Sequence, residues 1–360
     1  MNMNQRIAIQ ASRGIAACLV LLFHSSAMSF KYYQYDFLGI SSIGRSGGVD
    51  FFFMLTGFLL YHAYGKRIGA GISVTPFLTK RLIRIYPLYW LITLVVLPVY
   101  FLVPSFGYGY ETNQSTIVHS LLLLPQEHGP ILPVAWSLSY FVLFYLAFGL
   151  MLAVGKRPAY VFASLWIALT LCHVLRLPII AADMDHHVYL NFLFNEANLE
   201  FAIGCLLAKW TEHFKHRHYQ LLLGLGAVGF ALIWLNNKYN VLPYHDYLLY
   251  AIPSILVLLG AASVSDNMHL SVWVRALSKI GDASYSILLT HLLFISIMMK
   301  LARASHLAEN LGYLPTDILI VALTIPLCRL AYVWAEKPLV TFCQSKNTFK
   351  PTVSPRPSSS

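Results

Sequence analysis

Residues 9–28 read IQASRGIAACLVLLFHSSAM. This run is long enough to cross the hydrocarbon core of a bilayer, which takes ~20 predominantly apolar residues. Two ionisable residues, Arg13 and His24, interrupt it. Because an ionisable side chain at mid-membrane is costly, it marks a functional site by default. We therefore interpret this segment as a membrane-spanning helix that carries a polar function.

Arg13 and His24 lie on one face of that helix. Their separation in the sequence returns them to within about 20° of each other, ~16 Å apart along the axis. Each has a simpler interpretation, because a long arginine can reach back to the headgroups and a histidine near a helix end can lie at the interface. Their common face favours a shared function at two depths.

Apolar runs continue along the whole chain. Of 360 residues, 58% are hydrophobic and 11% charged, whereas soluble domains average roughly 45–50% and 25%. The net charge of +10 is spread over many short loops, which argues against nucleic-acid binding. Hydropathy and turn residues predict an all-α transmembrane bundle of about ten spans. The expected spans are 9–28, 47–64, 87–104, 134–154, 159–177, 190–208, 219–236, 247–264, 283–301 and 315–335.

The basic residues also predict the orientation of the bundle. With the N-terminus in the cytoplasm and residues 105–133 as one long external loop, most of the 25 lysines and arginines fall on the cytoplasmic side, as insertion requires. Both termini are then cytoplasmic. The first span has no cleavage signature after it, so we expect a retained span and a multi-pass protein of the bacterial cytoplasmic (inner) membrane.

The chain divides into a transmembrane domain, 1–340, and a cytoplasmic tail, 341–360, which we expect to be disordered because it ends in prolines and serines. The five cysteines lack the spacing of metal ligands, and we interpret them as reduced packing residues. The histidines in loops also do not resemble a zinc site. We therefore predict no metal.

Asp50 begins the second span in the sequence Gly47-Gly48-Val49-Asp50. The glycines permit close helix approach, and the expected depth of Asp50 matches that of His24. A carboxylate beside an imidazole fixes its tautomer and supports a general base. The alternative is a helix N-cap, for which aspartate is well suited.

Arg81 and Arg84 lie one turn apart just before the third span. Two guanidinium groups so placed could bind phosphates, although anchoring at the cytoplasmic face would also explain them. The aromatic residues that follow, Tyr86, Tyr89 and Trp90, are typical of an interfacial belt. Glu200 lies within the sixth span and His291 within the ninth, where pairing with a neighbouring helix is the alternative to catalysis.

Seven motifs in chain order resemble acyltransferase family 3, whose multi-span bacterial enzymes O-acylate carbohydrates and related surface molecules. The resemblance covers roughly residues 6–340. Its motifs are Arg13 with His24; Gly48-Val49-Asp50-Phe51-Phe52-Phe53 with Thr56-Gly57-Phe58; Arg81 to Trp90; Trp136-Ser137-Leu138-Ser139 with Phe144-Tyr145; Glu200-Phe201 with Gly204; Ser284-Tyr285-Ser286 with His291; and Glu336-Lys337-Pro338.

The resemblance implies about ten helices, an acyl-coenzyme A donor that enters from the cytoplasm, and an acceptor hydroxyl at the outer face. His24 then corresponds to the essential histidine, Arg13 to its paired arginine, and Arg81 and Arg84 to the basic motif for donor phosphates. The other motif residues expected at the substrates are Trp136, Ser137, Glu200, Ser284, Tyr285 and His291. The donor, by default acetyl-coenzyme A, is a substrate, and no tightly bound cofactor is implied.

The motif around Trp136 is most similar to members that acetylate exopolysaccharides, so we expect a carbohydrate acceptor, the lipid bilayer and proteins of polysaccharide assembly as partners. One departure is Phe141, which stands where members of the family commonly have a glutamate. It leaves open an inactive relative that only binds an assembly partner. A carrier or flippase for a lipid-linked sugar is the other alternative, although the inverted repeat typical of such carriers is absent from the sequence.

As a hypothesis, His24 acts as a general base on the acceptor hydroxyl, Asp50 orients its imidazole, and Arg13 stabilises negative charge nearby. His24 could equally carry the acyl group as a transient intermediate, which would suit donor and acceptor on opposite faces. The sequence leaves both mechanisms open.

Overall fold

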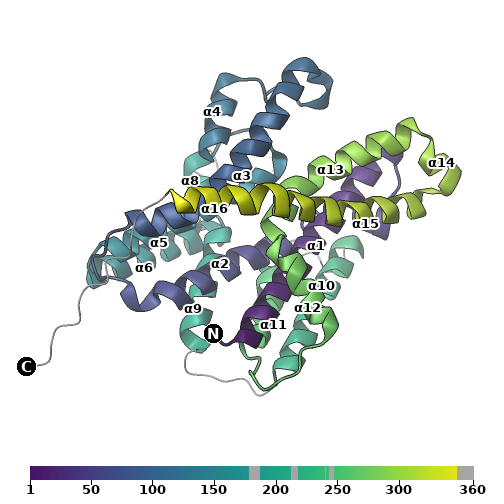
Figure 1. Ribbon diagram of the computed structural model, residues 1–360. Coiled ribbons are helices and arrows are strands. Elements are labelled where there is room, and N and C mark those ends of the chain that lie inside the picture. The colour runs from purple at the N-terminus through teal and green to yellow at the C-terminus, as the bar shows by residue number, and fades with distance from the viewer. Residues whose placement is uncertain (178–186, 212–217, 240, 243–246, 347–360) are drawn as a thin grey trace, which may run out of the picture.

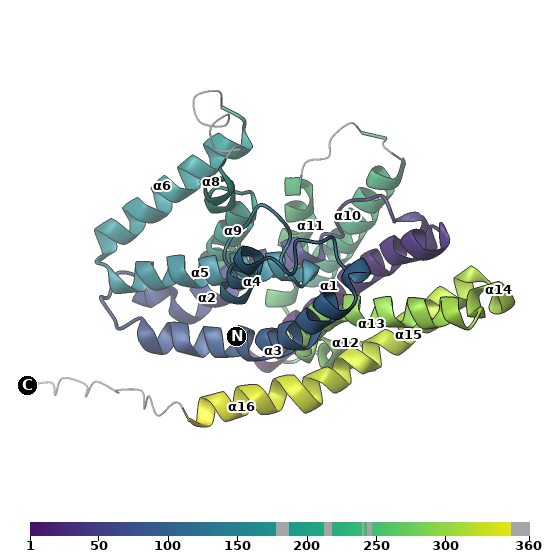
Figure 2. The ribbon, with the colours of Figure 1, turned by 90° about the horizontal axis from the view of Figure 1, so that it is seen from above.

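The computed structural model describes residues 1–177, 187–211, 218–239, 241–242 and 247–346. Every extended secondary-structure element in this part of the chain is a helix, which confirms the predicted all-α fold. Figure 1 shows a bundle in which α1 runs through the middle, and Figure 2 shows α6 and the α15–α16 pair toward opposite edges.

Seven helices of the described part are long and apolar enough to cross a membrane. They comprise α1 (Met3–Tyr33), α3 (Thr75–Leu102), α5 (Trp136–Ala153) with the turn before it, α6 (Lys156–Val174), α10 (Tyr219–Tyr239), α13 (Ser284–Ala304), and α15 (Tyr313–Ala331) continued into α16 (Lys337–Ser345) by a π-helical turn (Tyr332–Glu336).

The other three predicted spans correspond to shorter helices: α2 (Gly48–Tyr64), α9 (Ala197–Thr211) and α11 (Ala251–Ala262). α11 has 12 residues and rises only about 18 Å, well short of the ~30 Å hydrocarbon core. α2 packs against α1, α9 and α11, so its neighbours cover much of its surface. By length and composition, seven of the ten predicted spans are therefore supported.

Two helix pairs approach so closely that only glycine fits between them. A Cβ on Gly204 of α9 would meet the carbonyl oxygen of Met54 in α2, and one on Gly57 of α2 would meet that of Phe201 in α9. Small residues let helix backbones approach in this way. Gly48 likewise lies against the backbone of α1 at Ala16, as predicted for the glycines before Asp50.

α1 is also held against α12 (Val272–Asp282) by a pair of glycines. A Cβ on Gly14 would meet the backbone of Leu277, and one on Gly281 would meet the backbone of Gln10. The contact fixes the beginning of α13, which follows α12 directly. α1 and α13 therefore lie side by side, and this pairing positions the site described below.

The expected external loop, 105–133, contains a nine-residue helix, α4 (Gln114–Leu122). α4 is too short to cross a bilayer and lies beside α3 (Figure 1). Tyr86, Tyr89 and Trp90 of α3 donate hydrogen bonds to the carbonyl oxygens of Leu122, Ser120 and Leu121. The last carbonyls of a helix lack partners within it. These aromatic residues therefore fasten the end of α4, a role that the interpretation as an interfacial belt omitted.

The remaining described elements are short. They are α8 (Val188–Leu193), α14 (Leu307–Leu311) and the turns Phe37–Gly39, Gly65–Arg67, Pro104–Phe106, Pro133–Ala135 and Tyr247–Tyr250. All five cysteines are free. α16 carries the helical chain to Ser345, within the predicted tail of 341–360, and residues 347–360 lie outside the described part.

Candidate active site

Two histidines meet where α1 and α13 lie side by side. Nδ1 of His24 lies 3.1 Å from Nε2 of His291 and 2.9 Å from the carbonyl oxygen of Val20. Nδ1 of His291 lies 2.7 Å from the carbonyl oxygen of Ile287. His291 is fully buried. The sequence predicted a role for each histidine but did not predict that they would meet.

These distances assign the protons of both rings. A carbonyl oxygen only accepts, so Nδ1 of His291 donates to Ile287, and in the neutral ring its Nε2 is then an acceptor. Nδ1 of His24 donates toward that acceptor and toward Val20. The proton of His24 therefore sits on Nδ1, and its Nε2 keeps a lone pair, which is the form that a general base needs.

His24 lines a cavity of about 200 Å³, which we call the histidine cavity. Its wall also includes Arg45 and Asp50 from the beginning of α2 and the loop before it, and Trp136 and Ser137 from the beginning of α5. Ser137 donates a hydrogen bond to the carbonyl oxygen of Val134, and Trp136 is 40% exposed. Residues from four of the seven predicted motifs therefore lie close to this cavity.

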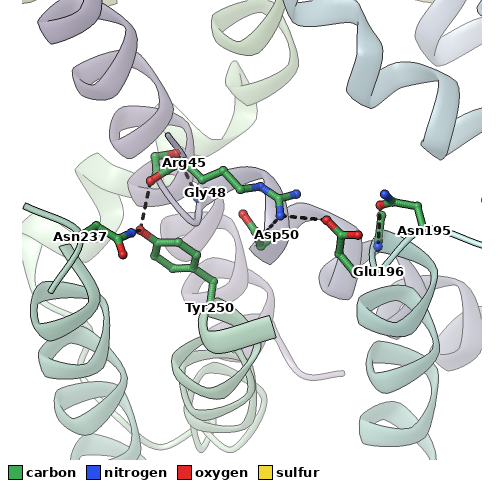
Figure 3. A network of polar contacts seen from close by, with 9 residues as sticks. Arg45, Gly48, Asp50, Asn195, Glu196, Asn237 and Tyr250 are labelled. Atoms are coloured by element: carbon green, nitrogen blue, oxygen red, sulfur yellow. Dashed lines mark hydrogen bonds and ion pairs between the residues drawn. The ribbon is translucent and has the colours of Figure 1, made fainter. Parts of the chain in front are cut away.

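Asp50 shares the cavity with His24 but pairs with another residue (Figure 3). Its carboxylate lies 3.7 Å from the guanidinium group of Arg45, which also lies 3.3 Å from Glu196. The carbonyl oxygen of Arg45 accepts a hydrogen bond from Tyr250. Among the described residues, no hydrogen bond joins Asp50 to His24. The imidazole is thus oriented by His291, where we expected Asp50.

The sequence motifs did not single out Arg45, which lies in the loop before α2. Its signal was its position, five residues before a buried acid, since a buried charge is normally paired. Glu200 belongs to the same acidic group: it is fully buried and neighbours Asp50. Its carboxyl oxygens accept no hydrogen bond from a described residue, and it lines none of the cavities described here.

At the end of the bundle where α1 begins lies a second cavity, of about 630 Å³, which we call the basic cavity. It collects positive charge from three separate segments, namely Arg6 and Arg13 of α1, Lys80, Arg81 and Arg84 of α3, and Lys337 of α16. Its acidic residues are Asp282 and Glu336. The arrangement suits an anion with several phosphates, because guanidinium groups bind phosphate oxygens bidentately.

Arg13 lies at the inner wall of the basic cavity. Its guanidinium group donates to Ser284 at 2.7 Å and to Gln10 at 2.9 Å. Arg81 lies over the rings of Tyr64 and Phe77, 5.6 and 5.7 Å from their centroids. Two different residues of α13 therefore bind these two side chains of α1: Ser284 binds Arg13, and His291 binds His24. The structure does not place Arg13 at the imidazole.

A third, narrower cavity of about 140 Å³ lies between these two, and we call it the central cavity. Ser284 and Tyr285 line it, and Tyr285 donates a hydrogen bond to the carbonyl oxygen of Ile85 at 2.6 Å. The rest of its wall is mostly apolar and includes Phe141. Phe141 packs edge-on against Phe53, with ring centroids 5.3 Å apart.

The three cavities have common walls. Arg13, Arg81 and Arg84 line both the basic and the central cavity, and Leu288 lines both the central and the histidine cavity. They therefore follow one another along α1 from its beginning to His24. A long, narrow molecule with an anionic head could lie along this route and reach His24 with its other end.

The motif that begins at Glu336 lies on the same route, because Glu336 and Lys337 line the basic cavity. Ser286 donates a 2.6 Å hydrogen bond to Glu336, which lies in the π-helical turn between α15 and α16. Such turns are frequent at functional sites. Among the described residues, no group of three or more His, Cys, Asp or Glu side chains could hold a metal ion.

Comparison with known proteins gives a family and two relatives. Residues 6–333 match the model of the acyltransferase domain. The chain is 30% identical over 340 residues to the exopolysaccharide production protein ExoZ of Rhizobium meliloti, covering 89% of this chain and 94% of that protein. It is 36% identical over 98 residues to protein 2 in the picA locus of Rhizobium radiobacter, covering 27% and 46%. No solved structure matches the chain significantly.

Proposed function

The chain belongs to the acyltransferase domain family, and from this premise we propose that it transfers an acyl group, acetyl by default, from acyl-coenzyme A to a hydroxyl group of a cell-surface glycan. The observation that carries the proposal is the route of three cavities along α1. It joins a basic cavity suited to the coenzyme's phosphates to a histidine whose Nε2 keeps its lone pair.

The donor would bind with its phosphates in the basic cavity. Arg81 and Arg84 of α3 lie there together with Arg13 of α1, although the two helices are far apart in the sequence. The pantetheine arm separates the phosphates from the thioester. From Arg13 to His24 the route covers ~16 Å along α1, so an extended arm in the central cavity would bring the thioester to the histidine cavity.

At the histidine cavity, Nε2 of His24 would take the proton of the acceptor hydroxyl as its oxygen attacks the thioester carbonyl carbon. The C–S bond then breaks, and the thiolate leaves with the proton held by His24. His291 would hold Nδ1 of the imidazolium in place throughout. Arg45 lines the same cavity, so we assign to it the stabilisation of the thioester oxygen that we expected from Arg13.

A covalent route uses the same geometry. Nε2 of His24 would attack the thioester, release the thiolate, and hold the acyl group until the acceptor hydroxyl takes it. Both routes require Nε2 to face the cavity with its lone pair. A rapid-quench search for labelled acyl group on His24 separates them.

The acceptor is inferred from the relative. ExoZ is an exopolysaccharide production protein, and its similarity over most of both chains supports an exopolysaccharide or related glycan as the acceptor. Association with polysaccharide-assembly proteins belongs to the same proposal. The chain would lie in the bacterial cytoplasmic membrane with ten crossings and both termini in the cytoplasm, so that the basic cavity faces the coenzyme pool.

The proposal is tested with purified protein in detergent, labelled acetyl-coenzyme A and de-O-acetylated exopolysaccharide from the producing cell. We expect transfer by the native protein and a fall of about 10²–10⁴ in rate for His24→Ala. His306→Ala is the matched control, because His306 is exposed and pairs only with Glu309 among the described residues. Undiminished transfer by His24→Ala would rule out His24 as base or acyl carrier. No use of any acyl-coenzyme A by the native protein would favour an inactive relative or a carrier.

A further inference from the structure

Two more cavities extend from the histidine cavity on the side of α4. The larger, of about 730 Å³, lies between α4, the segment after it and the beginning of α8, and we call it the polar cavity. The smaller, of about 390 Å³, lies between that segment, α5 and α8, and we call it the bridging cavity. Protein sites for drug-sized ligands have volumes of roughly 300–1,000 Å³.

These two cavities lie side by side, and the bridging cavity lies next to the histidine cavity; we call the pair the groove. Pro125 to His128 and Val188 line both the polar and the bridging cavity. Trp136 lines both the bridging and the histidine cavity. A ligand in this groove therefore approaches His24 past Trp136, whereas the coenzyme route reaches the histidine cavity along Leu288.

The lining of the groove suits a neutral sugar chain. Planar amides and carboxylates, which can make two hydrogen bonds each, come from Asn113, Gln126, Glu127 and Asn191. Aromatic side chains on which the C–H face of a sugar ring can pack come from Trp136, Tyr140, Tyr189 and Phe192. Hydroxyl groups alternating with C–H faces are the chemistry of a carbohydrate.

The groove differs from the coenzyme route in the charge of its lining residues. Among the described residues that line the polar and bridging cavities, none is lysine or arginine, and Glu127 is an acid. A phosphate group would find no arginine or lysine there, the residues on which phosphate recognition mainly depends, and the basic side chains of the lining are the histidines His119, His128 and His187. The basic cavity, in contrast, is lined by six such residues.

One buried atom of the groove has no hydrogen-bond partner among the described residues. Oε1 of Gln126 is buried and accepts no hydrogen bond from any described residue, whereas its Nε2 lies 3.3 Å from the hydroxyl of Ser120. A buried acceptor without a donor destabilises the fold. Because Gln126 lines both cavities, a rotation of its amide would turn Oε1 into the groove, where a sugar hydroxyl could supply the donor.

Side-chain contacts hold the walls of the groove in place. The hydroxyl of Tyr189 in α8 lies 3.3 Å from Nε2 of His119 in α4, and His128 stacks on Tyr110, with ring centroids 5.1 Å apart. The fixed end of α4 supports one wall, because three side chains of α3 bind its last carbonyls. A prearranged groove loses less conformational entropy when a ligand binds.

From these observations we propose that the polar and bridging cavities form the acceptor site, which binds an uncharged oligosaccharide segment of several sugar units and presents one hydroxyl past Trp136 to His24. This inference rests on the proposed function and specifies its acceptor. The volumes of the two neighbouring cavities make the enzyme selective for a chain over a single sugar, and their position places the sugars away from the coenzyme.

The test uses de-O-acetylated exopolysaccharide from the producing cell, partially hydrolysed and separated by length, with the protein in nanodiscs. Saturation-transfer NMR measures sugar binding, and a separate assay measures hydrolysis of acetyl-coenzyme A without acceptor. We expect longer fragments to bind more tightly than single sugars. Glu127→Trp would fill the junction of the two cavities and weaken binding of the longer fragments by at least about tenfold.

Glu309→Trp is the matched control, since it makes the same exchange at an exposed position on α14. Gln126→Leu provides a second variant of similar size, with the same expected loss of binding and an unchanged melting temperature. Fragment binding that is independent of length, or that is unaffected by Glu127→Trp, would overturn the acceptor site. Because binding is measured without transfer, groove binding retained in His24→Ala separates a failure of the chemistry from a failure of the site.

Discussion

At the scale of single residues, the site depends on which side chain orients His24. A carboxylate was the expected partner, yet Asp50 is paired with Arg45 at 3.7 Å and the imidazole is bound by His291 at 3.1 Å. A neutral histidine can do this because Ile287 holds the proton on its Nδ1, which leaves Nε2 as the acceptor. The ion pair of Arg45 and Asp50 lines the same cavity as the imidazole.

Replacing His291 tests this orientation. His291→Ala removes the acceptor for Nδ1 of His24, so we expect kcat to fall by about 10–10² while KM for acyl-coenzyme A stays close to native, because the donor's phosphates bind elsewhere. His291→Gln keeps an acceptor oxygen and should restore part of kcat. Steady-state kinetics of both variants measure the difference. Equal losses in the two variants would instead indicate a packing role.

Phe141 stands where members of the family commonly have a glutamate, and the structure places it in the wall of the central cavity. We expect Phe141→Leu to enlarge this cavity, where the pantetheine arm of the donor would lie, and to raise KM for acetyl-coenzyme A by about tenfold with kcat close to native, because apolar contacts to the arm are lost. Phe144→Leu is the control, because Phe144 packs against Phe141 but does not line the cavity. An unchanged KM in Phe141→Leu would contradict a role in donor binding.

At the scale of elements, close helix contacts determine the positions of the motifs. The contact of α2 with α9 brings Asp50 beside Glu200, and the contact of α1 with α12 sets α13 next to α1. In a bilayer, lipid tails are as apolar as leucine, so packing between small residues takes over the role of hydrophobic burial. Side chains on these helices are therefore positioned by backbone contact.

Gly204 provides the test of this packing. A Cβ at Gly204 would meet the backbone of α2, so Gly204→Ala should destabilise the protein by roughly 1–3 kcal/mol, the usual cost of overpacking, and lower its melting temperature in detergent. Gly224→Ala is the matched control, because Gly224 lies in α10 with nothing within 4 Å of an added Cβ. If both variants melt at the same temperature as the native protein, the α2–α9 contact is not as tight as described.

At the scale of the whole molecule, two routes meet at one histidine. The proposed coenzyme route begins in a cavity lined by six basic residues, and the proposed sugar groove is lined by aromatic, histidine and uncharged polar residues with one acid. If donor and acceptor lie on opposite sides of the membrane, as we propose, such an arrangement would let each reach the same imidazole without crossing. The orientation of the chain follows from this assignment.

Orientation is checked by single cysteines in a variant without the five native ones. Tyr108→Cys, in the segment before α4, should react with a membrane-impermeant thiol reagent added outside intact inner-membrane spheroplasts. Lys156→Cys and Lys80→Cys should react only after the membrane is opened, because positively charged loops stay in the cytoplasm. All three residues lie in the part of the chain that the structure describes, and Lys156 begins α6. Reaction of Lys80→Cys from outside would contradict the proposed donor side.

The sequence by itself determined the helical fold, the apolar runs and the residues that carry charge among them, because hydropathy and the cost of an intramembrane charge are local properties. It also named His24, Arg81 and Arg84 as candidates. Only the tertiary structure decided which of them meet. His24 meets His291, although 267 residues separate them, and the groove lined by Trp136 and Gln126 arises from α4, α5 and α8 together. Helix packing creates these contacts, and no local pattern records which faces will pack.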